Sequence, residues 1–316
     1  MDEVVWALAE QPVDAASVTT QGSGDTGESD HGGFPDAAGT TVSAWQRLRR
    51  AVWREVIGKS SIDMPGGPCR LALGSRHIQR RREWDLLFEM AAERSCIYDV
   101  GAKIGMTAMA MARGQRQGIV YAFEASELSS LIINRNLALN GLTERVVTVN
   151  GVLGSHSGAL FNYHWNIVSG RSGIVASPPQ GATPIGKVTV SLDAFTAQLD
   201  LRPDLVKIDV EGGEQEVIAG MGDIMARIGP DIILELHAWP GMPASRNAAA
   251  ILEMLLPVDY TMYWIARGQT VTNPAAFDDL EESPIGASSR ARVLLVKNNR
   301  PPSEVLKGVN IEHIDM

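Results

Sequence analysis

The chain has few cysteines, no long apolar run and fewer basic than acidic residues. Its two cysteines, Cys69 and Cys96, lack the spacing of a metal site and are too few for a disulfide framework, so a reducing, cytoplasmic location is expected. No apolar run approaches the ~20 residues of a membrane span, and no secretory signal pattern opens the chain, so no transmembrane segment is expected. The formal net charge of -9 argues against a general nucleic-acid-binding protein, which needs a positive field.

The composition changes along the chain and predicts three parts. Residues 1–41 are rich in Gly, Ser, Thr, Asp and Ala and offer too little apolar surface to bury, so we expect a flexible tail. Residues 42–94 are expected to form an N-terminal helical accessory segment, with amphipathic helices at Ala44–Gly58 and Arg80–Ala92. Residues 95–316 are expected to form the main domain.

Within the main domain, short apolar runs alternate with stretches of helical periodicity. The expected helices cover Thr107–Arg113, Leu128–Asn140, Glu214–Met221 and Ser245–Leu256. The expected strands are Cys96–Val100, Gly118–Glu124, Arg145–Leu153, Leu205–Val210, Pro230–His237 and two closing runs that start at Tyr260 and Arg290. This alternation predicts an α/β, doubly wound, Rossmann-like fold with a mainly parallel sheet. Ligands of such folds bind at the edge where the parallel strands end.

The first strand of this domain runs into an acid and two glycines, Asp99, Gly101 and Gly105. A dinucleotide fingerprint is G-x-G-x-x-G, whereas this loop reads D-x-G-x-x-x-G, with an acid that would repel a pyrophosphate. A cationic, phosphate-free ligand such as S-adenosyl-L-methionine suits this loop better. Glu124 ends the next strand, 19 residues after Gly105, about where such folds hold a ribose.

The stretch LVKIDVEGGE places three charges on alternate residues, Lys207, Asp209 and Glu211, so all three are expected on one face of a strand. An internal ion network and an active site are both compatible with this pattern. His237 ends a later strand and has an intrinsic pKa near neutrality, so we predict that it is the catalytic base, with Asp209 near the cofactor sulfonium and Glu211 orienting or pairing. A structural histidine that caps the strand is the alternative. These three residues could also gather a divalent ion, but no regular ligand spacing supports it, and no metal is expected.

The acceptor is expected to bind to a long connector, residues 154–187. It contains His164 and Trp165, whose rings could stack on a sugar or another ring, and Arg171, which could bind an acidic group of the acceptor. Trp239, which follows a later strand, is also expected to bind the acceptor. A hairpin that only covers the edge of the sheet is the alternative.

The order of the motifs DVGAKIG, VYAFEAS, NRNLALNGL, VSLDAF, LVKIDVEGGE and IILELH resembles the FkbM family of S-adenosylmethionine-dependent methyltransferases, over roughly Ile97 to His237. The resemblance implies a class I methyltransferase fold, whose seven-stranded, mostly parallel sheet has an antiparallel closing strand. It also implies methylation of hydroxyls on natural products and sugars. The cofactor-binding residues that it implies are Asp99, Gly101, Ala102, Gly105, Glu124, Ala125, Asn150, Gly151, Val152 and Asp209. The chain departs from the family pattern at Lys103, where Asn is usual, and at Ala125, where Pro is usual.

The sequence thus predicts an S-adenosylmethionine-dependent O-methyltransferase that acts by in-line displacement on a small-molecule or glycan acceptor. Neither a nucleic-acid partner nor a membrane span is expected, and a homo-oligomer is compatible with the sequence. One alternative is a nicotinamide-dependent oxidoreductase on the same kind of sheet. Another is a non-catalytic binding or scaffold protein derived from the methyltransferase fold.

Overall fold

The computed structural model describes residues 60–72, 78–166, 171–174, 185–238, 242–280, 290–298 and 300–307, and all of them lie in one compact unit. The expected flexible tail, the expected helix Ala44–Gly58 and Trp239 fall outside the described residues. Among the described helices, none combines the length and the apolar character that crossing a membrane requires.

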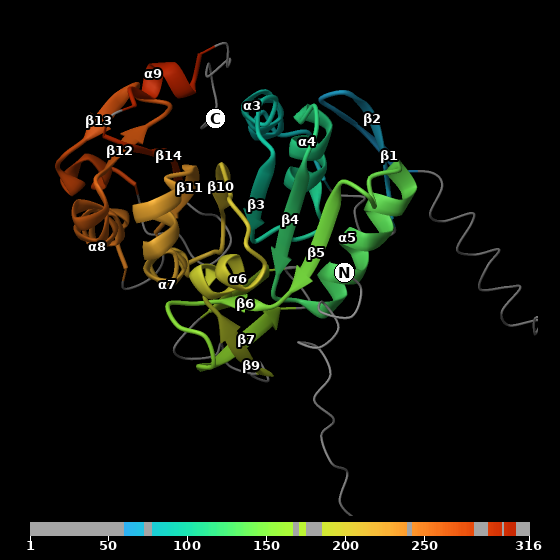
Figure 1. The fold of residues 1–316 in the computed structure, drawn as a ribbon, viewed down its shortest axis with the longest axis horizontal. Helices are drawn as coiled ribbons and strands as arrows, with labels where there is room; N and C mark the ends of the chain where they lie inside the picture. Colours follow the sequence, from blue (N-terminus) through green and yellow to red (C-terminus); the bar gives the residue numbers. More distant parts are fainter. Residues whose placement is uncertain are drawn as a thin grey trace, which may run out of the picture. The chain divides into compact units, whose positions relative to one another are not determined.

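A single eight-stranded sheet carries the main domain, in the order β13-β12-β14-β11-β10-β3-β4-β5, which Figure 1 shows from left to right. Five neighbouring strands are parallel: β5 (Val146–Asn150), β4 (Ile119–Glu124), β3 (Cys96–Val100), β10 (Leu205–Ile208) and β11 (Asp231–His237). β14 (Arg290–Lys297) runs antiparallel to both β11 and β12 (Tyr260–Trp264), as the expected closing strand does. The class I arrangement is therefore confirmed. The short β13 (Gln269–Val271), which pairs with β12, is an eighth strand that the sequence did not predict.

Helices cover both faces of this sheet because the buried strands are apolar on both sides. One core packs beneath α3 (Glu83–Met90), α4 (Met106–Gly114) and α5 (Glu127–Asn140). The other packs beneath α6 (Leu192–Gln198), α7 (Glu214–Ala219), η1 (Ile224–Ile228), α8 (Ala244–Leu255) and η3 (Pro274–Phe277). Side chains alternate between the two cores along each strand, so that in β3 Ile97 belongs to the first and Tyr98 to the second.

The accessory segment is only partly helical. Its described part contains the expected helix, which is shorter than predicted (α3), and an antiparallel hairpin of β1 (Ser60–Met64) and β2 (Gly67–Leu71). The hairpin is held to α5, where the side-chain oxygens of Asn136 and Asn140 accept hydrogen bonds from the backbone N–H groups of Ala72 and Arg70. The sequence analysis, which expected two helices in this segment, did not predict this hairpin.

A second, four-stranded sheet with the order β6-β9-β7-β8 is built from the connector after β5. It comprises β6 (Val152–Leu153), β7 (Leu160–Asn166), β8 (Arg171–Ile174) and β9 (Ile185–Val190). The run Arg145–Leu153, which was expected to be one strand, divides at Gly151 between the two sheets. In Figure 1 the small sheet lies beside the ends to which the arrows of β4 and β5 point. It therefore stands at the edge where the sequence places the ligands. The remaining short elements are η2 (Leu256–Val258) and α9 (Pro302–Val305).

Candidate active site

The glycine loop after β3 lies directly against the loop after β10. Gly101 has a φ of 81°, and a Cβ atom on it would stand 1.8 Å from the carbonyl oxygen of Asp209. The backbone N–H of Asp209 donates to the carbonyl of Val100 at 3.0 Å, which fixes the two loops to each other. Only glycine allows both this backbone conformation and this approach. The loop that was expected to hold a cofactor therefore also positions Asp209.

Glu124, at the end of β4, closes the other side of this loop. Its two carboxylate oxygens accept backbone N–H groups, from Lys103 at 2.8 Å and from Ser126 at 2.7 Å. Burial raises the pKa of this carboxyl, and the two N–H groups oppose the rise. Its own carbonyl oxygen accepts from Gly151 N–H at 3.0 Å and from Asn150 Nδ2 at 2.9 Å. Glu124 thus joins the glycine loop to the segment after β5.

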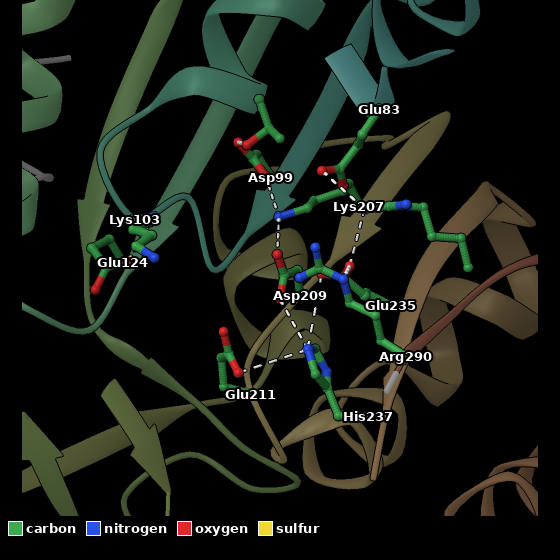
Figure 2. Close-up of polar contacts among 12 residues, drawn as sticks. Glu83, Asp99, Lys103, Glu124, Lys207, Asp209, Glu211, Glu235, His237 and Arg290 are labelled. Atoms are coloured by element: carbon green, nitrogen blue, oxygen red, sulfur yellow. Dashed lines mark hydrogen bonds and ion pairs between the residues drawn. The ribbon is translucent and has the colours of Figure 1, made fainter. Parts of the chain in front are cut away.

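Lys103 stands in the glycine loop with a φ of 55°, in the left-handed region, and is exposed to solvent. Asparagine tolerates this conformation better than lysine does, which gives a physical reason for the usual family residue at this position. The backbone of Lys103 nevertheless makes its hydrogen bond to Glu124. Figure 2 shows these two residues together, away from the charged groups around Lys207.

Lys207 is a buried cation between two carboxylates. Its Nζ lies 3.5 Å from Asp99 Oδ1 and 3.5 Å from Asp209 Oδ2, as the dashed lines in Figure 2 mark. Burial alone would lower the pKa of Lys207, but the charges of Asp209 and Asp99 outweigh it and raise this pKa. The other oxygen of Asp99 accepts from the Thr107 hydroxyl at 2.6 Å. Asp99 is fully buried, and the partners described for its carboxylate are Lys207 and Thr107. The expected contact between Asp99 and a cofactor ammonium stays a prediction.

His237, at the end of β11, lies among carboxylates. Its Nδ1 is 2.7 Å from Glu214 Oε1, while Nε2 is 3.7 Å from Asp209 Oδ1 and 3.8 Å from Glu211 Oε2. Burial would lower the pKa of His237, but the hydrogen bond to Glu214 and the neighbouring negative charges raise it to about 9. Free of other ligands, the imidazole is therefore charged at neutral pH. A charged imidazole has no lone pair to accept a proton, so a base role requires that His237 first lose its second proton, and this role stays a prediction.

The three charges of the KIDVEGGE stretch do meet, but not on one strand face. β10 ends at Ile208, and Glu211 follows in a left-handed turn with a φ of 51°. This turn carries the Glu211 side chain back toward His237, and 33% of that side chain remains exposed. Burial would raise the pKa of Asp209, but the Lys207 and His237 charges hold it well below its usual range.

Four further charged residues complete this cluster and were not predicted: Glu83, Glu235, Arg290 and Arg292. Glu235 Oε1 lies 2.8 Å from Arg290 Nε and 3.1 Å from an Arg292 guanidinium nitrogen, and Glu83 Oε2 lies 3.6 Å from Arg292. Burial and the charge of Asp209 raise the pKa of Glu235 to about 8. Glu235 could have been found, because it stands two residues before His237 in a strand and shares its face. Glu83 comes from α3, and no local signal connects it to this edge.

The other predicted site residues divide into two groups. Ala102 is buried in the glycine loop, Gly105 caps α4 with a φ of 85°, and the Ala125 carbonyl accepts from Lys187 Nζ of the small sheet at 2.6 Å. Asn150, Gly151 and Val152 follow beside Glu124. His164 and Trp165 lie in β7 and Arg171 in β8, in strands whose side chains are outside the description. Their acceptor role, like that of Trp239, stays a prediction.

Comparisons with known proteins identify the family of this chain. The model of the methyltransferase FkbM domain matches residues 99–262, slightly more than half of the chain. Methyltransferase sdnD of Sordaria araneosa is 27% identical over 186 residues, which cover 50% of this chain and 71% of that protein. Methyltransferase FkbM from Methylobacillus flagellatus, which has a crystal structure, is 14% identical to this chain with a TM-score of 0.40. The match covers 70% of this chain and 49% of the Methylobacillus chain, so this chain spans about half the length of that relative. The fibrillarin of Aeropyrum pernix, described with bound S-adenosyl-L-methionine, is 13% identical with a TM-score of 0.41, over 76% and 84% of the two chains. The chain belongs to the FkbM methyltransferase family.

Proposed function

We propose that this methyltransferase uses S-adenosylmethionine to methylate a hydroxyl group of a neutral, polyhydroxylated acceptor, such as a sugar, a polysaccharide or a natural product. One observation carries the proposal. The glycine loop with Glu124 and the carboxylates of Asp209 and Glu211 stand at the same edge of one sheet, and Gly101 contacts Asp209 directly. The proposed cofactor site and a group of partly exposed acids are thereby adjacent.

The residues at the ends of β3, β4 and β5 suit a cationic adenosyl ligand. Each carboxylate oxygen of Glu124 accepts one backbone N–H, which leaves lone pairs for the two hydroxyls of a ribose. The N-terminus of α4 after Gly105 offers N–H groups to a ligand carboxylate. The surrounding acids favour an ammonium and a sulfonium and repel a pyrophosphate. When bound, S-adenosylmethionine supplies an electrophilic methyl group carried on a sulfonium.

On the acceptor side, the exposed parts of Asp209 and Glu211 suit a neutral hydroxyl compound. Their side chains are 19% and 33% exposed, so a substrate can reach their oxygens. Carboxylates accept hydrogen bonds from hydroxyls and can take the proton that an acceptor loses as its oxygen is methylated. The same negative charge disfavours an anionic acceptor. Holding the acceptor oxygen in line with the methyl carbon can contribute about 7–11 kcal/mol to the rate.

The cofactor part of the proposal is tested by calorimetric titration of the full chain with S-adenosylhomocysteine. We expect binding, and we expect Glu124→Gln to weaken it about 10- to 100-fold, because charge-assisted hydrogen bonds contribute about 1.5–3 kcal/mol. Glu127→Gln is the matched control, since the Glu127 side chain is 82% exposed. Absence of binding, or binding of NADH in its place, would overturn the proposal.

The acceptor part is tested by a screen with labelled methyl donor. Neutral sugars, oligosaccharides and polyketide alcohols form one arm of the screen, and primary amines and anionic acceptors form the other. We expect label only in the first arm. Transfer to amines alone would refute O-methylation while leaving the cofactor assignment intact.

A further inference from the structure

A buried nitrogen of His237 lies near three carboxyl groups without a hydrogen bond to any of them. The residue is 2% exposed, and among the described residues Nε2 has no hydrogen-bond partner. The oxygens nearest to it are Asp209 Oδ1 at 3.7 Å, Glu211 Oε2 at 3.8 Å and Glu235 Oε2 at 3.9 Å, and all three are beyond hydrogen-bond distance. Figure 2 shows the carboxylates of Asp209 and Glu211 turned toward the ring. A buried polar atom that lacks a partner is costly and points to a missing ligand.

Glu214 determines what Nε2 can offer. Its Oε1 lies 2.7 Å from Nδ1, so the proton of the neutral ring is on Nδ1 and the Nε2 lone pair faces the carboxylates of Asp209 and Glu211. When a metal ion displaces the second proton of the ring, the Nε2 lone pair and the oxygens of Asp209 and Glu211 face one another across the same space. A second proton on Nε2 would find its nearest acceptor at 3.7 Å, too far for a hydrogen bond. A cation in that space would satisfy all three groups.

The distances suit a metal ion. Ligand atoms about 2.1 Å from an ion and roughly 90–110° apart are separated by about 3.0–3.5 Å, so modest side-chain rotations would close the site. One atom each of Asp209, Glu211 and His237 lies within 4.8 Å of the others. A carboxylate behind a histidine, as Glu214 stands here, is the usual support of a metal-binding imidazole. We propose that Asp209, Glu211 and His237 bind one divalent first-row metal ion, and that Glu214 orients the imidazole.

A neighbouring acidic group, formed by Glu83, Asp209 and Glu235, does not share these properties. Arg290 and Arg292 already lie within 3.1 Å of Glu235, and Arg292 lies 3.6 Å from Glu83. The two arginines therefore already balance the negative charge of Glu83 and Glu235. Lys207 pairs with Asp209 Oδ2, which is not the oxygen of Asp209 that faces Nε2. Among the described residues, neither Glu211 nor Asp209 Oδ1 forms an ion pair with a lysine or an arginine.

The three proposed ligand atoms indicate which metal ions can bind and how a bound ion could contact the acceptor. One imidazole nitrogen with two carboxylate oxygens suits Mn²⁺, Fe²⁺ or Zn²⁺ better than the all-oxygen preference of Mg²⁺. Three protein ligands leave positions open for two oxygens of an acceptor with adjacent hydroxyls. The contact between the ion and the acceptor rests on the proposed function, whereas the binding of the ion to the protein does not. In this arrangement the ion would lower the pKa of the acceptor hydroxyl, and the second oxygen of Glu211 would take the proton.

The test is a titration of the chelator-treated full chain with Mn²⁺, followed by the loss of the electron paramagnetic resonance signal of the free ion. We expect one ion per chain. Glu211→Gln should weaken binding at least tenfold, and Glu214→Gln about 10- to 100-fold. His156→Gln, which changes an exposed histidine that contacts Ser155, should leave binding unchanged.

The result that overturns the inference is an unchanged Mn²⁺ signal up to about millimolar ion with wild-type protein, or wild-type binding by a folded His237→Gln variant. Because Glu211 is partly exposed, its variant is expected to fold, and circular dichroism checks this. Titration with S-adenosylhomocysteine separates the two proposals. Cofactor binding without Mn²⁺ binding refutes the metal site alone, while Mn²⁺ binding without cofactor binding refutes the proposed function and leaves the metal site standing.

Discussion

Replacing Gly101 by alanine should destabilise the protein far more than its single methyl group suggests. The residue has a φ of 81°, which costs a residue with a Cβ about 1–2 kcal/mol. The new Cβ would also stand 1.8 Å from the Asp209 carbonyl oxygen, which belongs to the backbone and cannot rotate away. Overpacking of this kind adds about 1–3 kcal/mol or more. We expect Gly101→Ala to lower the free energy of unfolding by about 2–5 kcal/mol.

Gly141→Ala provides the control, because Gly141 has a φ of 66° and a Cβ there would meet nothing within 4 Å. It should cost only the conformational part, about 1–2 kcal/mol. Urea denaturation followed by circular dichroism measures both losses. Equal losses for the two variants would show that the loop after β10 moves freely away from Gly101. The argument that Gly101 positions Asp209 would then be refuted.

Three further predictions concern single charged residues. Lys103→Gly should raise the free energy of unfolding by about 0.5–1 kcal/mol in urea, because Lys103 has a φ of 55°; no gain would show that this loop is unstrained. Lys207→Met should cost about 3–5 kcal/mol by the same measurement because it leaves buried carboxylates without their cation, and adding Asp99→Asn should recover part of the loss. The pKa of His237 is about 9 in the folded state and about 6.5 in the unfolded state, so the folded state binds more protons between these two pH values. The contribution of His237 to the free energy of unfolding is therefore complete below pH 6.5 and is lost as the pH rises through 9. With chelator present, urea titrations of wild type and His237→Gln should therefore converge toward alkaline pH; a constant difference would contradict the shift.

The main sheet and the cofactor edge could be predicted because their signals are local. The runs that became β3, β4, β10 and β11 are short, apolar and bounded by turn residues, and right-handed connections between parallel strands place their ends together. Asp99 and Glu124 follow directly from that placement. Elements with weak local signals were missed: β13 has only three residues, and the β1–β2 hairpin depends on its hydrogen bonds to side chains of α5.

The charge cluster was harder to predict because it depends on contacts between distant segments. Alternation along a strand correctly grouped Lys207 with Asp209, but it could not foresee the left-handed turn that brings Glu211 to His237. The ionisation of His237 likewise depends on Glu214, which lies on a different element. The intrinsic pKa alone therefore does not decide whether His237 acts as a base, and that role stays a prediction.

The position of α3 has a practical consequence for anyone who expresses part of this protein. The family match begins at residue 99, which invites a truncated clone starting there. Such a clone would remove Glu83, whose carboxylate lies 3.6 Å from Arg292, together with Trp84, which is buried in the core beneath the helix. Loss of activity in such a fragment would result from the missing helix and would not be evidence about the chemistry of the intact enzyme.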